Sequence, residues 1–229
     1  MQRHSAFARE GIGAFVVCAI IAIALAKWFG PLWALPMLIP IGLLIALFQD
    51  PVRESPLRPL AALAPCDGKV ISVGLCRAGL LDRESLRVII RVNPWGAYTL
   101  RAPVEGKIFD PRDNDSEGSK MTGRGGLWLR TDEGDDVVVA FSGGHFFSVP
   151  MSFRRYGERV GHGHRCGFLR LAVRCEVYLP ANALPRVEEG DRVLAAVDVL
   201  ADLVRERASK EVEGEEVADS ASDASSETA

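Results

Sequence analysis

The pattern of hydrophobic and polar positions divides the chain into three unlike segments. Residues 11–48 are apolar with a single formal charge, whereas residues 64–204 alternate short β-branched runs with turns rich in glycine and aspartate. The C-terminal residues contain no aromatic side chain and many acidic ones. We therefore predict a membrane helical hairpin (residues 1–50), a β domain (residues 51–205) and a disordered acidic tail (residues 206–229).

The apolar segment is too long to be one membrane helix. Its 38 residues would rise about 57 Å as an α-helix, against roughly 30 Å for a hydrocarbon core. The run breaks at K-W-F-G-P (residues 27–31), which predicts two helices over residues 12–28 and 32–48. The aromatic residues near this break, Trp28 among them, are typical of a membrane interface.

Two alternatives to membrane insertion are weaker. A signal peptide would have a shorter apolar run and a small-residue cleavage site before the mature domain. A helical hairpin buried in a soluble core would need more covering surface than the rest of the chain can supply. Pro36 and Pro40 would kink the second helix, so a hairpin that enters the bilayer only partway also stays open.

The flanking charges predict the orientation of the hairpin. Arg3, His4 and Arg9 precede the first helix, and Arg53 and Arg58 follow the second one. Because only Lys27 lies between the helices, the positive-inside rule places both ends in the cytoplasm. The five cysteines include no CxxC pair, which suits a reducing compartment. We therefore expect an inner-membrane protein whose soluble domain faces the cytoplasm.

The middle segment has the hydrophobic pattern of a mainly β domain. β-branched or alternating runs predict strands. These runs cover residues 70–73, 86–92, 137–141, 167–173 and 175–179. Only residues 192–207 have a pattern that a helix could adopt, and their start fits a strand better.

A repeated motif, A-P-x-[D/E]-G-K-[V/I], refines this fold class. It occurs at residues 64–70 and 102–108, and a related turn lies at residues 187–193. Proline fixes one backbone angle, the acid favours a turn, and glycine accepts a positive φ before the strand. Tandem strand–turn units of this kind predict a hammerhead or barrel-sandwich-like β domain. A lipoyl or biotinyl carrier is disfavoured, because Lys69 and Lys107 enter strands and do not lie at a hairpin tip.

Net charge separates the tail from the body. The whole chain carries −3, and residues 206–229 contain two basic and eight acidic side chains, which leaves +3 for the rest. The composition predicts a solubilising tail, with a protein-binding role as the alternative. A body of +3 without a basic stripe gives no indication of nucleic-acid binding.

Six short motifs follow the apolar hairpin in a fixed order. They are F-Q-D-P (48–51), P-C-D-G-K-V (65–70), R-A-P-V-E-G-K-I (101–108), G-F-L-R (167–170), E-V-Y-L-P (176–180) and residues 187–194. This order resembles the phosphatidylserine decarboxylase family, in its short, membrane-anchored, archaeal-type-like form. The resemblance implies a place in phospholipid metabolism, where the family converts phosphatidylserine to phosphatidylethanolamine.

The resemblance also implies a specific chemistry. Family members cut their own chain before the serine of a Gly-Ser pair, and the new N-terminus becomes a pyruvoyl group. Its ketone forms a Schiff base with the substrate amine and accepts electrons as carbon dioxide leaves. An Asp-His-Ser set promotes the cut, with histidine as the base and aspartate orienting it.

Only one of these three positions matches in this chain. Asp67 stands at the family's aspartate, whereas Tyr98 stands at the histidine and Ala172-Val173 at the Gly-Ser pair. Valine has no heteroatom on Cβ, so it can neither attack a carbonyl nor yield a pyruvoyl group. Tyrosine, with an ordinary pKa of about 10, is a poor general base at neutral pH. We therefore expect no cofactor and no pyruvoyl-dependent decarboxylase activity.

Three features could replace or reinterpret the lost chemistry. Gly118-Ser119 is the only Gly-Ser pair, but it lies in a turn-rich acidic loop well before the expected position. Cys175 could form a thioester, because a two-residue offset keeps the same face of a strand. A buried small apolar side chain is the alternative for Cys175. Asp67 could simply shape its turn.

Histidines and arginines supply the remaining candidates. His162 and His164, with His145, resemble a metal-binding set, but flanking glycines favour a solvent-facing turn, so we expect no metal. Guanidinium groups suit bidentate binding of phosphate. The candidate substrate-binding residues are Arg101, Arg170 and Arg174, with Arg91 and Arg165 as further contacts for lipid phosphate. A solvated strand face is the alternative for these arginines.

Three hypotheses for the function remain. The first is a membrane protein with the family fold that lacks decarboxylase activity and binds phospholipid or a partner, such as an active decarboxylase or another lipid-synthesis protein. The second is an active phosphatidylserine decarboxylase with unorthodox maturation. The third is a non-enzymatic membrane adaptor. The sequence leaves the lipid ligand and the oligomeric state open.

Overall fold

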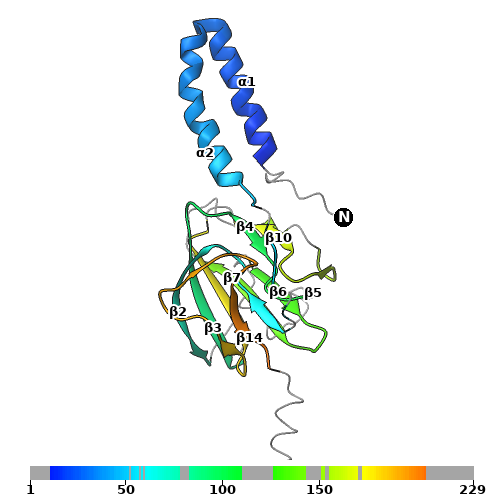
Figure 1. Cartoon of the computed structure of the whole chain (residues 1–229). Coiled ribbons are helices and arrows are strands. Elements are labelled where there is room, and N and C mark those ends of the chain that lie inside the picture. Colours follow the sequence, from blue (N-terminus) through cyan, green and yellow to red (C-terminus); the bar gives the residue numbers. More distant parts are fainter. Residues whose placement is uncertain are drawn as a thin grey trace, which may run out of the picture.

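The computed structural model shows an apolar hairpin joined to a β domain (Figure 1). It describes residues 11–51, 53–56, 58, 60–77, 83–109, 126–142, 151–152, 155–169 and 172–204. The predicted acidic tail lies outside the described residues. Within them the fold is mainly β and begins with an apolar helix, which confirms the predicted fold class.

Two apolar arms lie antiparallel at the top of Figure 1. The first arm is α1 (Ile12–Phe29), which has 18 residues and no buried side chain. At 1.5 Å per residue α1 is about 27 Å long, close to the roughly 30 Å of a hydrocarbon core. Within the described part of the chain, α1 is the one helix whose length and composition suffice to cross a membrane.

The second arm is not the continuous α-helix predicted over residues 32–48. It consists of a 3₁₀ helix, η2 (Pro31–Met37), followed by α2 (Leu38–Phe48). Pro36 lacks the N–H that an α-helix would bond to the carbonyl four residues earlier, and its ring would clash there. Seven 3₁₀ residues and eleven α-helical residues still extend about 30 Å, so the two arms have similar lengths.

The β domain centres on one antiparallel sheet of eight strands, in the order β13-β2-β3-β11-β7-β6-β5-β9. These strands are β2 (Gly68–Cys76), β3 (Ser85–Val92), β5 (Gly106–Phe109), β6 (Gly126–Arg130), β7 (Asp136–Ser142), β9 (Arg159–Val160), β11 (Arg174–Pro180) and β13 (Arg192–Val193). The predicted strands over residues 70–73, 86–92, 137–141 and 175–179 fall within β2, β3, β7 and β11 and are confirmed.

Two three-stranded sheets, β4-β10-β8 and β1-β14-β12, complete the domain. Their strands are β1 (Ala61–Leu63), β4 (Thr99–Arg101), β8 (Met151–Ser152), β10 (Arg165–Phe168), β12 (Leu184–Pro185) and β14 (Val199–Asp202). The predicted strand over residues 167–173 is only partly right, because β10 ends at Phe168 and Ala172 then donates a turn hydrogen bond to Leu169. The described residues 192–204 form β13 and β14 with turns between them, and not a helix.

Alternation along β3 shows how the sequence specifies the large sheet. Val88, Ile90 and Val92 are buried in the main core, whereas Arg91 between them is exposed. In a strand, successive side chains point to opposite faces. One face of β3 therefore packs on the core and the other carries charge.

Close approach of neighbouring strands, and not positive φ, explains the glycine of the repeated motif. Neither Gly68 nor Gly106 has a positive φ. A Cβ at Gly68 would lie 2.2 Å from the carbonyl oxygen of Arg91, and one at Gly106 would lie 2.3 Å from that of Arg130. The repeat thus marks two places where adjacent backbones leave no room for a side chain. The lysine after each glycine enters a strand, as predicted.

The linker after α2 fastens the hairpin to the β domain. The ring of Phe48 stacks on Phe168 of β10, with centroids 5.2 Å apart. The carboxylate of Asp50 then accepts hydrogen bonds from Arg101 Nη2 at 3.0 Å and Thr99 Oγ1 at 3.2 Å, both on β4. The second arm therefore ends directly on the sheet that contains β4 and β10.

We expect Phe168→Ala to lower the free energy of unfolding of the β domain by about 3–5 kcal/mol, because it removes a buried ring and leaves a cavity beside Phe48. Urea titration of the full-length protein in detergent measures the change. Leu75→Ala on the exposed face of β2 is the matched control and should stay within about 0.5 kcal/mol. Equal effects of the two substitutions would contradict the anchoring role of Phe168.

Candidate functional site

The loop between β3 and β4, residues 93–98, brings together the positions that the sequence analysis singled out. Asn93 donates its backbone N–H to the carbonyl of Asp67 at 2.9 Å. Val92, directly before the loop, donates to the carbonyl of Val173 at 3.0 Å. Tyr98 is the last residue of the loop. Three positions that are far apart in the sequence thus lie around one short segment.

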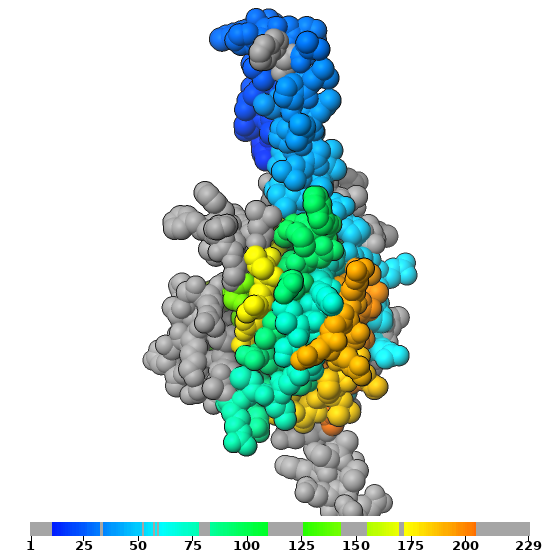
Figure 2. Space-filling view, turned by 90° about the vertical axis from the view of Figure 1, so that its left-hand side faces the viewer, coloured from blue at the N-terminus to red at the C-terminus, as the bar shows by residue number. Residues whose placement is uncertain are grey.

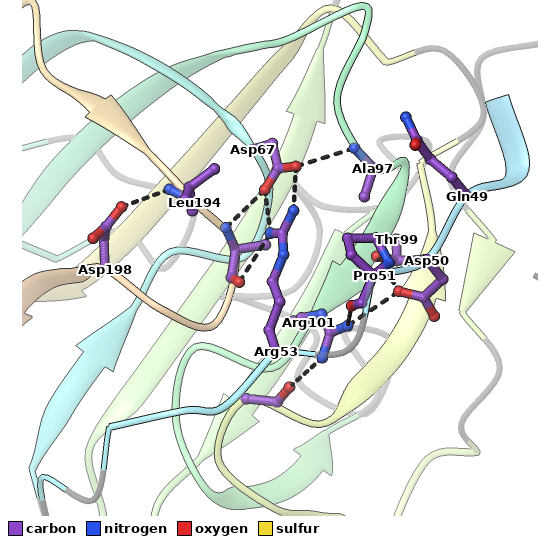
Figure 3. Close-up of polar contacts among 12 residues, drawn as sticks. Gln49, Asp50, Pro51, Arg53, Asp67, Ala97, Thr99, Arg101, Leu194 and Asp198 are labelled. Carbon is purple, nitrogen blue, oxygen red and sulfur yellow. Dashed lines mark hydrogen bonds and ion pairs between the residues drawn. The ribbon is translucent and has the colours of Figure 1, made fainter. Parts of the chain in front are cut away.

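Asp67 is buried at this site and fully hydrogen-bonded (Figure 3). One carboxylate oxygen, Oδ1, accepts hydrogen bonds from Arg53 Nη1 and from the backbone N–H of Ala195 at 2.8 Å. The other, Oδ2, accepts from Arg53 Nη2 at 2.7 Å and from the backbone N–H of Ala97 at 3.0 Å. A carboxylate offers about four lone-pair sites, and these four donors occupy them.

The same contacts determine the charge of Asp67. Burial alone would raise the pKa of Asp67, but hydrogen bonds from Arg53, Ala195 and Ala97 outweigh it, so the pKa lies below its ordinary value. Asp67 is therefore ionised at neutral pH, and Arg53 neutralises it. This arrangement supports the turn-shaping interpretation of Asp67, because no lone pair is left to orient a neighbouring base.

Tyr98, the residue expected from the sequence to replace the family histidine, has a hydroxyl group that is already hydrogen-bonded. The hydroxyl donates to the carbonyl of Pro94 at 3.1 Å, within its own loop. The ring lies 6.4 Å from that of Phe168, centroid to centroid. Burial raises the pKa of Tyr98 above its ordinary value. Tyr98 is thus even less suited to accept a proton at neutral pH than an exposed tyrosine.

The Ala172–Val173 peptide lies just before β11, next to the end of β3. Ala172 is buried, whereas the side chain of Val173 is 52% exposed. Neither side chain carries an oxygen, nitrogen or sulfur atom. The residues present therefore do not fit the pyruvoyl group that the resemblance implies, because that group originates from a serine.

Cys175 is not an exposed substitute for the missing serine. Its side chain is fully buried. Burial and a hydrogen bond with Cys66 raise the pKa of the Cys175 thiol far above its ordinary value. The expectation that positions 173 and 175 share a strand face is wrong, because β11 begins only at Arg174. Cys175 thus agrees with the alternative of a buried small apolar side chain.

The candidate arginines divide into inward and outward groups. Arg101 is buried, and its guanidinium also donates to the carbonyls of Pro51 at 3.2 Å and Gly163 at 3.4 Å. Together with its ion pair to Asp50, these bonds make Arg101 a clamp on the linker. Arg91 and Arg174 are exposed, and Arg165 Nε lies 3.7 Å from Asp50. Arg170 lies outside the described residues.

The histidine pair forms a turn, as predicted, but only His164 faces solvent, because His162 is half-buried and Gly163 is buried. Gly163 between the two histidines has a φ of +69°, and Nε2 of His162 lies 2.8 Å from the carbonyl oxygen of Ala61. The described residues include no group of three potential metal ligands. His145 and the Gly118-Ser119 pair lie outside the described residues. His162 also lines an open pocket of about 500 Å³, which none of Asp67, Tyr98 and Val173 borders.

Curated relatives identify the family of this chain. A phosphatidylserine decarboxylase proenzyme from Nitrosomonas eutropha is 34% identical over 211 residues, covering 87% of this chain and 96% of the relative. The chain belongs to the phosphatidylserine decarboxylase family. The corresponding proenzymes of Nitrosomonas europaea and Ralstonia nicotianae are 35% and 32% identical, each over 87% of this chain and 96% and 97% of the relatives.

Two further comparisons add little to this assignment. No protein-family model matches the chain. Among solved structures, the chain is similar to glucose permease IIA from Mycoplasma capricolum, with 20% sequence identity and a TM-score of 0.41 over 62% of this chain and 94% of that one. The phosphatidylserine decarboxylase assignment, and with it a role in phospholipid metabolism, therefore rests on the curated relatives.

Sequence analysis missed the two residues that hold the decarboxylase-like site and the hairpin together. Arg53 pairs with Asp67, and Asp50 pairs with Arg101. Both lie in the run Q-D-P-V-R directly after the apolar segment. The available signal was a pair of opposite charges around Pro51, close to the end of the apolar segment, but it did not identify their partners.

We expect Asp67→Asn to lower the free energy of unfolding by about 3–5 kcal/mol, because it leaves the part-buried guanidinium of Arg53 without its counter-charge. Urea titration of the full-length protein measures the change. The double variant Asp67→Asn/Arg53→Met removes both charges and should lose less than the single variant. An equal or larger loss in the double variant would show that the ion pair is not the source of the effect.

The lowered pKa of Asp67 also predicts an acid sensitivity. The stabilisation from a carboxyl group with a lowered folded-state pKa is present above its unfolded pKa, about 3.9, and is lost as the pH falls through the folded value. We expect the free energy of unfolding to decline below about pH 5, and to decline less steeply in Asp67→Asn. Asp136, whose pKa is also lowered, leaves a residual slope in the variant. Parallel pH curves for both proteins would contradict the assignment to Asp67.

Proposed function

We propose that this chain is a membrane-anchored member of the phosphatidylserine decarboxylase family that forms no pyruvoyl group and does not decarboxylate phosphatidylserine. The observation that carries the proposal is Val173 at the position of the cleaved serine. Self-cleavage needs a side-chain nucleophile there, and elimination needs a heteroatom on Cβ. Valine supplies neither, so neither self-cleavage nor the elimination that yields the pyruvoyl group can occur at this residue.

The two other processing positions support the same conclusion independently. The hydroxyl of Tyr98 donates to the carbonyl of Pro94, and burial raises the pKa of Tyr98, so the phenol stays protonated at neutral pH and cannot accept a proton. The carboxylate of Asp67 is saturated by Arg53 and two backbone N–H groups. A general base is therefore missing, and the retained aspartate has no free acceptor site with which to orient one.

The proposed placement follows from the hairpin and its flanking charges. The two arms enter the bacterial inner membrane, and the β domain remains on the cytoplasmic side. In this position the domain binds membrane phospholipid, an active decarboxylase or another lipid-synthesis protein. The chain needs no cofactor for such a role.

We expect the full-length protein, purified in detergent, to give one species near 24.9 kDa in denaturing mass spectrometry. Carboxyl-labelled phosphatidylserine should release no carbon dioxide above a protein-free control, and borohydride should change neither result because no ketone is present. The Nitrosomonas eutropha proenzyme, expressed in parallel, is the positive control for cleavage and for activity.

Two outcomes would overturn the proposal. Cleavage before Ser119 or Cys175 with a carbonyl-blocked end, or borohydride-sensitive release of carbon dioxide, would establish an active enzyme with unorthodox maturation. An uncut, inactive protein that recovers lipid-synthesis enzymes in pull-downs, and shows no preference among lipids, would favour the adaptor form of the proposal over the lipid-binding form.

A further inference from the structure

Four cationic side chains form a row across one end of the large sheet. Arg174 of β11 lies directly opposite Arg91 of β3. Arg91 lies opposite Lys69 of β2, and Lys69 lies opposite Arg192 of β13. Directly opposed residues of antiparallel strands share one face of the sheet, and all four residues are exposed. We call these four residues the basic row.

The basic row corrects the expectation of a body without a basic stripe. Its members come from four strands and are far apart in the sequence, so only the strand register reveals them. With strands about 4.8 Å apart, four neighbouring residues span about 14 Å. The described chain offers them no ion-pair partner, whereas Arg83 and Arg130 share Asp136, and Arg186 pairs with Asp202.

Two acidic residues close to the basic row accept hydrogen bonds from residues outside it. Glu176, the next residue on that face of β11, accepts hydrogen bonds from Ser142 at 3.0 Å and Tyr178 at 2.8 Å. The carboxylate of Asp191, beside Arg192, accepts the backbone N–H of Glu188 at 2.8 Å. Like charges directly opposite each other destabilise a sheet. Glu176 and Asp191 keep their negative charges because their donors are neutral, but among the described residues neither forms an ion pair with the basic row, so they offset its repulsion only in part.

The basic row lies at the end of the sheet nearest the hairpin. Arg91 is the penultimate residue of β3, and the loop that follows contains Trp95, which is 75% exposed. Gln49, directly after α2, donates to the carbonyl of Trp95 at 3.4 Å. Figure 2 shows the green end of β3 and the adjacent part of β2 beneath the blue hairpin, with the orange C-terminal segment beside them.

We propose that the basic row binds the anionic phospholipid headgroups of the membrane that holds the hairpin. Guanidinium groups bind phosphate oxygens in bidentate fashion, and clusters of basic residues beside a membrane helix attract anionic lipids. Trp95 next to the row suits the interface. A row that crosses the strands presents all four charges at a similar depth. The tether to the bilayer favours lipid over a soluble polyanion.

This inference rests on the membrane placement in the proposed function, but not on the loss of chemistry. Phosphatidylglycerol is a suitable probe because it is anionic and has no serine carboxyl group to lose. Binding of phosphatidylglycerol therefore neither requires nor reports decarboxylase activity. A failure of lipid binding would not contradict the proposal of an inactive enzyme. Detection of decarboxylase activity would likewise not contradict lipid binding by the basic row.

The test is native mass spectrometry of the full-length protein in nonionic detergent, titrated with phosphatidylglycerol or phosphatidylcholine. We expect a preference for phosphatidylglycerol in the unmodified protein. In Arg91→Gln/Arg174→Gln the affinity for phosphatidylglycerol should fall about 25-fold, which is about fivefold per cation, with no change for phosphatidylcholine. Arg77→Gln/Arg186→Gln has the same net charge, lies outside the basic row, and should retain the preference.

Thermal unfolding provides a second measurement. The substitutions that weaken lipid binding are not expected to lower the unfolding temperature of the lipid-free protein. Without anionic lipid, Arg91→Gln/Arg174→Gln should unfold at the same or a higher temperature, because a repulsive pair is removed. Phosphatidylglycerol should raise the unfolding temperature of the unmodified protein more than that of the variant. The inference is overturned if Arg91→Gln/Arg174→Gln is destabilised without lipid, or if both double variants bind phosphatidylglycerol equally.

Discussion

The buried carboxylate of Asp67 is the interaction on which the rest of the domain depends. Its four donor groups come from three segments that are remote in the sequence: Arg53 of the linker after α2, Ala97 of the β3–β4 loop and Ala195 of the turn after β13. A buried charge without partners is strongly unfavourable, so these segments must meet if Asp67 is to be buried. One ion thereby positions the hairpin, the candidate site and the C-terminal strands relative to one another.

This structural role gives Asp67 a function that does not depend on decarboxylase chemistry. An aspartate that only oriented a catalytic base would have no function once histidine and serine were replaced. In this chain Asp67 still joins Arg53 to two backbone segments, so its removal affects folding whatever the state of the site. Val173 is half exposed and offers no polar side-chain group, whereas Tyr98 contributes a buried ring to the main core and a hydroxyl that bonds within its own loop.

Sequence patterns predicted the strands, whose alternation depends on the burial of each residue. They missed the contacts between strands, which depend on how the strands pair. The apolar residues Val88, Ile90 and Val92 identified β3, because an apolar residue at every second position of a strand indicates the face that is buried. The 3₁₀ form of η2 needed the backbone consequence of Pro36, for which the sequence indicated only a kink. The glycine at position 68 suggested a turn conformation, but its cause is the carbonyl of Arg91, a neighbour known only from strand pairing. The partners of Asp67 and the basic row were hidden for the same reason.

The charged residues of this domain differ in how strongly folding constrains them, depending on whether they are buried or exposed. The two inward arginines, Arg53 and Arg101, are paired and hydrogen-bonded, since an unpaired buried charge would prevent folding. The basic row is exposed, where opposed like charges cost only a fraction of this, about 0.2–1 kcal/mol per pair. The free protein can tolerate a repulsion of this size between neighbouring cations, and a bound anion would remove it. Folding therefore constrains the buried charges strongly and the exposed ones weakly, so the proposed lipid-binding role of the basic row does not depend on the chemistry of the interior.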